Sequence, residues 1–270
     1  MSGGVESVLL MIGMPRSGTT LVHSVISNHG QVFGVSEPFQ SRREHDFKET
    51  NPNMLALAFD HSQASPANLC VKETTTRRIN VQLSFDLLDM SEREGLFSTV
   101  LLLLRNPYES YLSQIEASKK YWNQKKLTEV SSETFTVFGR STLSGFREIS
   151  ERIRGYTHRV TTYDRFCRDP ENETARIMAL YPLPFDGAQL QDFSASQPNV
   201  GDPKVVEKGS NIQRTDRAQM IEDLRRKFSS EPPFGLFEAL SELERASSAL
   251  TPDADIIDEL TRITVKSWGY

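Results

Sequence analysis

The segment from Gly13 to Thr20 has the residue types and the spacing of an anion-binding loop. It reads Gly-Met-Pro-Arg-Ser-Gly-Thr-Thr and directly follows a short apolar run. The two glycines allow a tight turn, and N–H groups of such a loop and of the helix after it can point at phosphate oxygens. The pattern therefore predicts a phosphate-binding loop, with the ligand contacted by Pro15, Arg16, Ser17, Gly18, Thr19 and Thr20.

The cation of this loop is in an unusual place. Nucleotide triphosphatases have a lysine directly after the second glycine, which acts with magnesium on the β- and γ-phosphates. Here that position is Thr19, and the cation is Arg16, inside the loop. This difference weighs against ATP or GTP chemistry and favours another phosphate anhydride. The alternative is an ordinary strand-turn-helix whose glycines serve only packing.

A second candidate anion site follows the most apolar run of the chain, residues 98–104. Arg105 ends this run, with Pro107 and Ser113 after it. Arginine offers a charged fork of donors, and Ser113 adds a hydroxyl about two helical turns further on. Both side chains could face one bound anion, although Ser110 competes with Ser113 for this role.

Strands alternating with helices must position these residues. Short apolar runs at 8–12, 69–71 and 98–104 are typical of strands buried on both faces, and two further strands are predicted at 31–35 and 159–163. Helical spacing is found at 19–28, 81–89, 108–117, 133–154, 170–181 and 215–228. The order predicts one α/β domain over residues 1–270, with a central, mostly parallel sheet of about five strands and helices on both faces.

Two charged residues stand where strands are predicted to end. Glu37 follows residues 31–35 and Lys72 follows residues 69–71. Open α/β sheets bind their ligands at the carboxyl ends of their strands, so both are candidate site residues. The alternatives are a surface carboxylate at Glu37, and a Lys72 that only pairs with Glu73 or Glu37.

The loop resembles a known family. Pro15-Arg16-Ser17-Gly18-Thr19-Thr20-Leu21 is similar to the 5′-phosphosulfate loop of sulfotransferases that use 3′-phosphoadenosine-5′-phosphosulfate (PAPS). Golgi carbohydrate, protein-tyrosine and many bacterial members have arginine at the position of Arg16, where cytosolic members often have lysine. Arg105, Pro107 and Ser113 resemble the 3′-phosphate motif of the same family. The resemblance implies a P-loop three-layer fold, PAPS as co-substrate, sulfuryl transfer to an acceptor hydroxyl, and no metal.

The resemblance also implies catalytic roles. Glu37 would be the base that takes the proton of the acceptor hydroxyl. Lys72 and Arg16 would form a cationic clamp on the oxygen of the leaving phosphate. Because His45 and His61 lie in a polar segment expected to border the acceptor, a histidine base stays open.

Two later segments match the family less closely. Tyr163-Asp164-Arg165-Phe166, followed by Asp169-Pro170, is similar to a strand-end Tyr-Glu-Asp-Leu segment of the family. Residues 201–209 resemble a late loop that closes over the nucleotide. The arginine of that loop is replaced here by glutamate, so Lys208 or Arg214 are the candidates to contact the 3′-phosphate.

Composition narrows the class of protein. The chain has 270 residues, a net charge of −5 and a pI of about 5.7, which argues against a global basic surface for nucleic acid or anionic membranes. Cys70 and Cys167 are too few for a disulfide framework and are expected to be buried thiols. The apolar runs are too short for a signal or a membrane span, which favours a cytoplasmic protein.

The acceptor is the least determined part of the prediction. A hydroxyl-bearing small molecule or natural product is expected, in a pocket shaped by residues 40–66 and 114–140. Four aromatic side chains could pack against it, or could be core because of their helical spacing: Tyr121, Trp122, Phe135 and Phe138. The other functions left open are a P-loop kinase or nucleotide hydrolase and a non-catalytic nucleotide-binding protein. The oligomeric state is not predicted.

Overall fold

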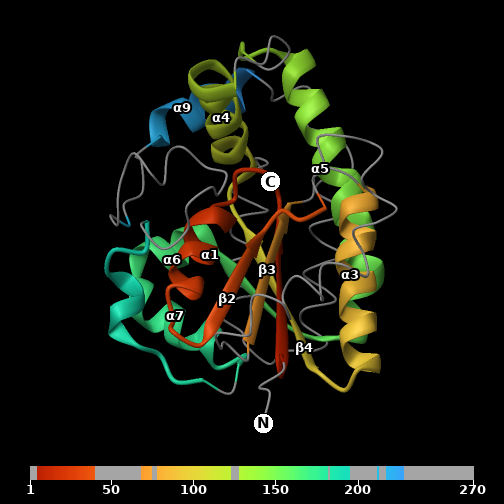
Figure 1. Ribbon diagram of the computed structural model, residues 1–270. Coiled ribbons are helices and arrows are strands. Elements are labelled where there is room, and N and C mark those ends of the chain that lie inside the picture. The colour runs from red at the N-terminus through yellow and green to blue at the C-terminus, as the bar shows by residue number, and fades with distance from the viewer. Residues whose placement is uncertain are drawn as a thin grey trace.

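A five-stranded parallel sheet forms the centre of the computed structural model (Figure 1). The structure describes residues 5–39, 68–74, 78–122, 128–181, 183–194, 212 and 217–227. The strands are β1 (Ser7–Gly13), β2 (Val32–Ser36), β3 (Asn68–Thr74), β4 (Phe97–Leu104) and β5 (Thr157–Thr162). They lie in the order β2-β3-β1-β4-β5, and every neighbouring pair is parallel. The predicted α/β fold is confirmed.

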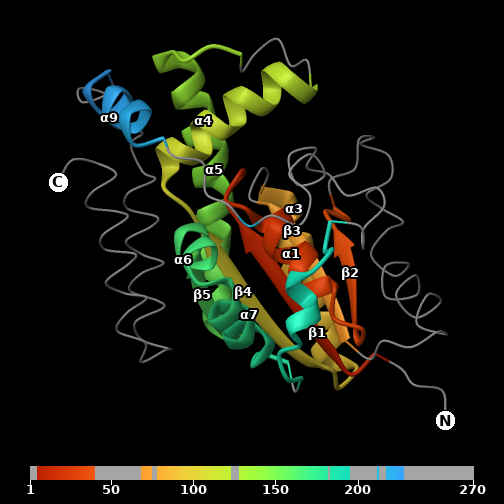
Figure 2. The same cartoon turned by 90° about the vertical axis from the view of Figure 1, so that its left-hand side faces the viewer.

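Helices cover both faces of this sheet (Figure 1). One face carries α1 (Thr19–Ser27), α6 (Tyr163–Arg168) and α7 (Pro170–Met178), and the other carries α3 (Arg78–Arg93) and α5 (Ser132–Arg152). Beyond the carboxyl ends of the strands lie α4 (Pro107–Ala117) and α9 (Ala218–Lys227), side by side in Figures 1 and 2. The short elements are η3 (Ser118–Trp122), η4 (Ile153–Gly155) and η5 (Gly187–Leu190).

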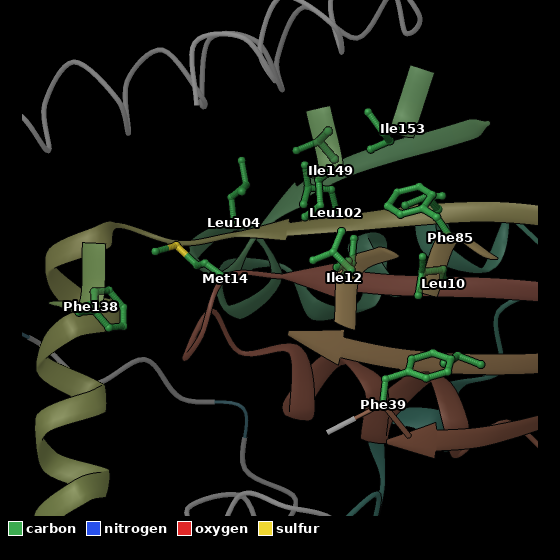
Figure 3. Packing of buried hydrophobic residues seen from close by; sticks show 14 of the residues in the cluster. Leu10, Ile12, Met14, Phe39, Phe85, Leu102, Leu104, Phe138, Ile149 and Ile153 are labelled. Atoms are coloured by element: carbon green, nitrogen blue, oxygen red, sulfur yellow. The ribbon is translucent and has the colours of Figure 1, made fainter. Parts of the chain in front are cut away.

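The unbroken apolar run of β1 is explained by its central position. Successive side chains of a strand point to opposite faces. Leu10 and Ile12 pack on the side of α3 and α5, whereas Leu9 and Met11 pack on the side of α1 and α7. All four side chains are fully buried. Figure 3 shows the first of these clusters, in which Leu10 and Ile12 lie near Leu102, Phe85 and Ile149.

The parallel pairing brings the ends of the strands to one edge of the sheet. Gly13 at the end of β1 stands beside Thr74 of β3 and Leu103 of β4, and Ser36 of β2 stands beside Lys72. The loop after β1, Glu37 after β2, Lys72 within β3 and the residue after β4 are therefore neighbours. This edge of the sheet positions the candidate site.

Several element boundaries differ from the sequence prediction. The predicted helix 81–89 is longer at both ends, because polar residues extend α3 without adding to its apolar pattern. The helix predicted at 108–117 is continued beyond its end by the π-helical turn η3. The helix predicted at 170–181 ends at Met178, and a separate short helix, α6, precedes it. That one domain spans residues 1–270 stays a prediction, because the described residues end at Lys227.

The two cysteines also differ from each other. Cys70 is buried, and burial raises the pKa of its thiol to about 12 even though a hydrogen bond with Tyr181 acts in the opposite direction. Cys167, on the short helix α6, is only partly buried, so the expectation of two buried thiols was wrong for this residue. Neither of the two cysteines forms a disulfide.

Candidate functional site

The loop between β1 and α1 needs both of its glycines. A Cβ atom on Gly13 would lie 2.6 Å from the carbonyl oxygen of Leu103, which belongs to the neighbouring strand β4. Gly18 has a φ of 93° and is the N-cap of α1, where no side chain caps the helix. Glycine is favoured there because other residues rarely adopt this left-handed backbone conformation. The loop thus packs tightly against the sheet at the start of a helix.

Lys72 lies at the centre of a buried polar cluster. Its Nζ atom donates a hydrogen bond of 2.9 Å to the Thr20 hydroxyl and forms an ion pair of 2.9 Å with the Glu37 carboxylate. The Lys72 side chain is 1% exposed and that of Glu37 is 29% exposed. The structure therefore brings together Glu37, Lys72 and Thr20, from three different elements.

Glu73 is not the partner of Lys72. Its side chain is fully buried and points elsewhere: it accepts hydrogen bonds from the backbone N–H groups of Phe39, at 3.2 Å, and Thr74, at 3.0 Å. Of the two partners left open by the sequence, Glu37 is the one that Lys72 contacts. Glu73 instead holds the chain two residues beyond Glu37, which fixes the turn that carries this carboxylate.

Two of the predicted site residues have strained backbones. Among the described non-glycine residues, Arg16, Glu37 and Asp192 have positive φ angles, of 64°, 50° and 47°. Such conformations cost about 1–3 kcal/mol each and persist where surrounding contacts hold them. For Glu37 one such contact is its backbone N–H, which donates to the Lys72 carbonyl at 2.7 Å. The strand β3 therefore fixes the backbone of Glu37 and also carries Lys72, the residue that pairs with the Glu37 carboxylate.

Arg105 links the second anion motif to the loop. Its Nη1 atom donates to the carbonyl oxygen of Arg16 at 3.0 Å, and its Nε atom donates to the Glu109 carboxylate at 3.0 Å. Arg16 in turn donates through Nε to the Ser113 hydroxyl at 3.4 Å. Arg16, Arg105 and Ser113 therefore lie together. The competing hydroxyl of Ser110 is buried and has no hydrogen-bond partner within the described part of the chain.

Tyr163 completes this corner from the end of β5. The guanidinium carbon of Arg105 lies 4.0 Å from the centre of the Tyr163 ring. The same ring packs against Gly18, where an added Cβ would be 2.3 Å from Cδ2. Burial raises the pKa of the Tyr163 hydroxyl well above its ordinary value, although the charge of Arg105 lowers it in part. The ring is therefore neutral beneath the guanidinium.

A third arginine, Arg217, stands just before α9. Its side chain is buried, donates to the backbone carbonyl of Glu109 at 3.5 Å, and forms an ion pair with Glu116. Burial and the positive charge of Arg105 lower the pKa of Arg217. The positive charges of Arg105 and Arg217 repel each other, and an anion bound beside them would reduce this repulsion.

The sequence matches the protein family described as sulfotransferase domain over residues 6–227, which is most of the chain. The chain belongs to the sulfotransferase family. A search of curated proteins found no match.

Solved structures of sulfotransferases share its fold. A sulfotransferase domain from the curacin biosynthetic pathway is 17% identical, with a TM-score of 0.52 over 92% of this chain and 98% of that one. A sulfotransferase domain from the Synechococcus PCC 7002 olefin synthase is 15% identical, with a TM-score of 0.51 over 92% and 96%. A mouse sulfotransferase, SULT7A1, complexed with PAP, is 10% identical, with a TM-score of 0.54 over 95% and 89%.

The structure brings most of the described candidate site residues of this sulfotransferase together, and it adds two side chains that were not among them. Arg217 had no local signal in the sequence, and Tyr163 was noted only as part of a family-like segment, because the contacts of both depend on elements that are distant in the chain. The predicted contacts Lys208 and Arg214, and the candidate bases His45 and His61, lie outside the described residues.

The sequence left two roles open for four aromatic residues of the sulfotransferase, the acceptor pocket or the core, and two of them belong to the core. Phe135 and Phe138 are buried and pack against Tyr111, with ring centres 5.0 and 5.8 Å away, so they are core residues. Tyr121 is partly exposed on η3. The described residues include no cluster of three metal-ligating side chains and no helix that could span a membrane.

Proposed function

We propose that this sulfotransferase takes its sulfuryl group from PAPS and transfers it to the hydroxyl of a small-molecule or natural-product acceptor. The observation that carries the proposal is the contact between the two anion motifs. Arg105 donates directly to the Arg16 carbonyl, so the loop after β1 and the cation after β4 form one continuous donor surface. A donor with phosphate groups on both its 5′ and 3′ positions suits such a surface.

The proposed donor contacts follow from the positions of the side chains. Residues Pro15 to Thr20 bind the 5′-phosphosulfate through the loop and the start of α1. Arg105 and Ser113 bind the 3′-phosphate, and Arg217 adds positive charge on the same side. Lys208 remains a proposed contact without described geometry. In the mouse relative complexed with PAP, the ligand is the desulfated form of this donor.

In the proposed reaction, the partly exposed Glu37 acts on the acceptor and the buried Lys72 acts on the leaving group. The acceptor oxygen bonds to sulfur while the bond between sulfur and the bridging oxygen breaks, and the electron pair of that bond stays on the 5′-phosphate. Glu37, which is partly exposed, accepts the acceptor's proton. Lys72, which is buried beside Thr20, and Arg16 stabilise the charge that develops on the leaving oxygen. The cytoplasmic location expected from the sequence belongs to the same proposal.

Calorimetric titration tests the donor assignment directly. Adenosine 3′,5′-bisphosphate (PAP) is titrated without magnesium, beside ATP with magnesium. We expect tight binding of PAP and none of ATP. Binding of ATP alone would reject the sulfotransfer proposal and favour a kinase or hydrolase. An acceptor screen with PAPS, read out as PAP formation, then tests turnover, and a protein that binds PAP but uses no acceptor would favour a non-catalytic role.

A further inference from the structure

We infer that Tyr163 is a positioning residue that holds the Arg105 guanidinium against the phosphate loop. The inference rests on the proposed use of PAPS, because it concerns how the donor's binding groups are oriented. Tyr163 is the first residue of α6 and directly follows β5, the strand beside β4. It therefore stands at the same edge of the sheet as Arg105.

The first contact of the ring is with the loop. The backbone of Gly18 approaches so closely that an added Cβ would lie 2.3 Å from Cδ2 and 2.8 Å from Cε2 of Tyr163. Glycine at position 18 is thus required by the ring as well as by its own φ of 93°. Because Gly18 is the N-cap of α1, the ring packs where the loop turns into the helix.

The second contact is with the cation. The Arg105 guanidinium lies over the ring face at 4.0 Å, a geometry in which the ring quadrupole attracts a cation. Two further contacts, with the Glu109 carboxylate and the Arg16 carbonyl, fix its direction within its plane. The other N–H groups of Arg105 have no hydrogen-bond partner among the described residues, so they are available to an anion.

The aromatic ring, rather than the hydroxyl, makes both contacts. Tyr163→Phe keeps the ring and should leave PAP affinity within about threefold of the wild type, whereas Tyr163→Leu removes the stacking surface. A cation–π contact of a desolvated arginine corresponds to roughly a tenfold change in affinity. We therefore expect Tyr163→Leu to weaken PAP binding about tenfold.

A double-mutant cycle separates positioning from a general structural role. PAP affinity is measured for the wild type, Tyr163→Leu, Arg105→Ala and the double variant. If the ring acts through Arg105, Tyr163→Leu should cost about tenfold in the wild type and less than about twofold when Arg105 is already alanine. An equal loss in both backgrounds, or no loss in either, would overturn the inference.

The matched control is Tyr181→Leu. Tyr181 is also a buried tyrosine on the side of α1 and α7, and its hydroxyl donates to the Leu69 carbonyl at 3.2 Å. We expect this variant to lower stability while leaving the PAP affinity within about threefold of the wild type. A tenfold loss of affinity for Tyr181→Leu would mean that general loosening explains the Tyr163 result, and would overturn the inference.

Urea unfolding of the same four proteins without nucleotide distinguishes failure of this inference from failure of the proposed function. A coupling between Tyr163 and Arg105 in the free energy of unfolding is expected whether or not PAP binds. If the effects of the two substitutions on the free energy of unfolding were simply additive, the stacking contact itself would be overturned. A wild type that binds no PAP, with coupled unfolding, would overturn the proposed function and the donor role of the ring, but not the packing.

Discussion

Two groups of ion pairs in this molecule are built in opposite ways. At the carboxyl edge of the sheet, Lys72 pairs with Glu37 and Arg105 pairs with Glu109; we call these the edge pairs. Between α3 and α5, Glu148 lies between Arg78 and Arg152, and Arg152 also contacts Asp86; we call this the helix network. Both groups join separate elements of the fold.

They differ in whether the cations are buried. In the edge pairs the cations are almost inaccessible, with Lys72 at 1% and Arg105 at 6% exposure. In the helix network the carboxylate of Glu148 is 4% exposed while Arg78 is 69% exposed. A buried cation held by a neighbouring carboxylate suits recognition of an anion, whereas a buried carboxylate whose cations reach solvent suits cohesion of two helices. Variants of the edge pairs should therefore change turnover or PAP affinity, whereas variants of the helix network should change only stability.

The largest effect is expected for Glu37→Gln. The amide keeps the shape of the side chain but cannot accept a proton, so kcat should fall about a thousandfold. PAP affinity should stay within about twofold, which steady-state kinetics and calorimetry on the same preparation would measure. Full activity of this variant would show that Glu37 is not the base.

Lys72→Met should have the next largest effect. The substitution keeps an unbranched chain in the buried position but removes the charge proposed to stabilise the leaving oxygen, so kcat should fall about a hundredfold. Glu37 should tolerate the loss of its partner because it reaches solvent. Unchanged turnover would show that the pair of Lys72 and Glu37 is only structural, as the helix network is.

Arg105→Ala should weaken PAP binding about thirtyfold, since a charged hydrogen bond contributes roughly 2 kcal/mol. It also leaves the fully buried Glu109 without this partner, so stability should fall as well. Adding Glu109→Gln removes the stranded charge. We expect the double variant to regain stability in urea unfolding but not PAP affinity; recovery of both would show that Arg105 acts only through Glu109.

The smallest effect is expected for the helix network. Burial acts to raise the pKa of Glu148, but hydrogen bonds and charges of Arg152 and Arg78 outweigh it, so this pKa is lowered. Such a group stabilises the fold above its unfolded pKa of about 4.3, and this contribution is lost as the pH falls through the lower, folded pKa.

Glu148→Gln should therefore lower the melting temperature at pH 7 by about 3 °C, roughly 1 kcal/mol for a chain of this size. The difference from wild type should shrink as the pH falls below about 4. Turnover at pH 7 should not change. A constant difference at all pH values would show that the ion pairs do not cause the stabilisation.

The sequence could predict the features that depend on local patterns. β1 and β4 were visible as unbroken apolar runs because they are buried on both faces, and the loop after β1 was visible because its glycines are close together in the chain. The sequence left Glu73 and Glu37 open as partners of Lys72, since the choice depends on β2 lying beside β3 with Ser36 opposite Lys72. Nothing near Arg217 in the sequence indicates that the charge of Arg105 acts on it, because α9 must first pack beside α4.

The backbone of Glu37 has a practical consequence for engineering. Its φ of 50° is one that glycine adopts without strain, so Glu37→Gly would relax the turn after β2. The same substitution would leave the buried Lys72 ammonium without the carboxylate that it pairs with, which costs more than the turn gains. A laboratory selection that rewards heat resistance alone should therefore retain Glu37, so the ion pair protects the proposed base during directed evolution of this scaffold.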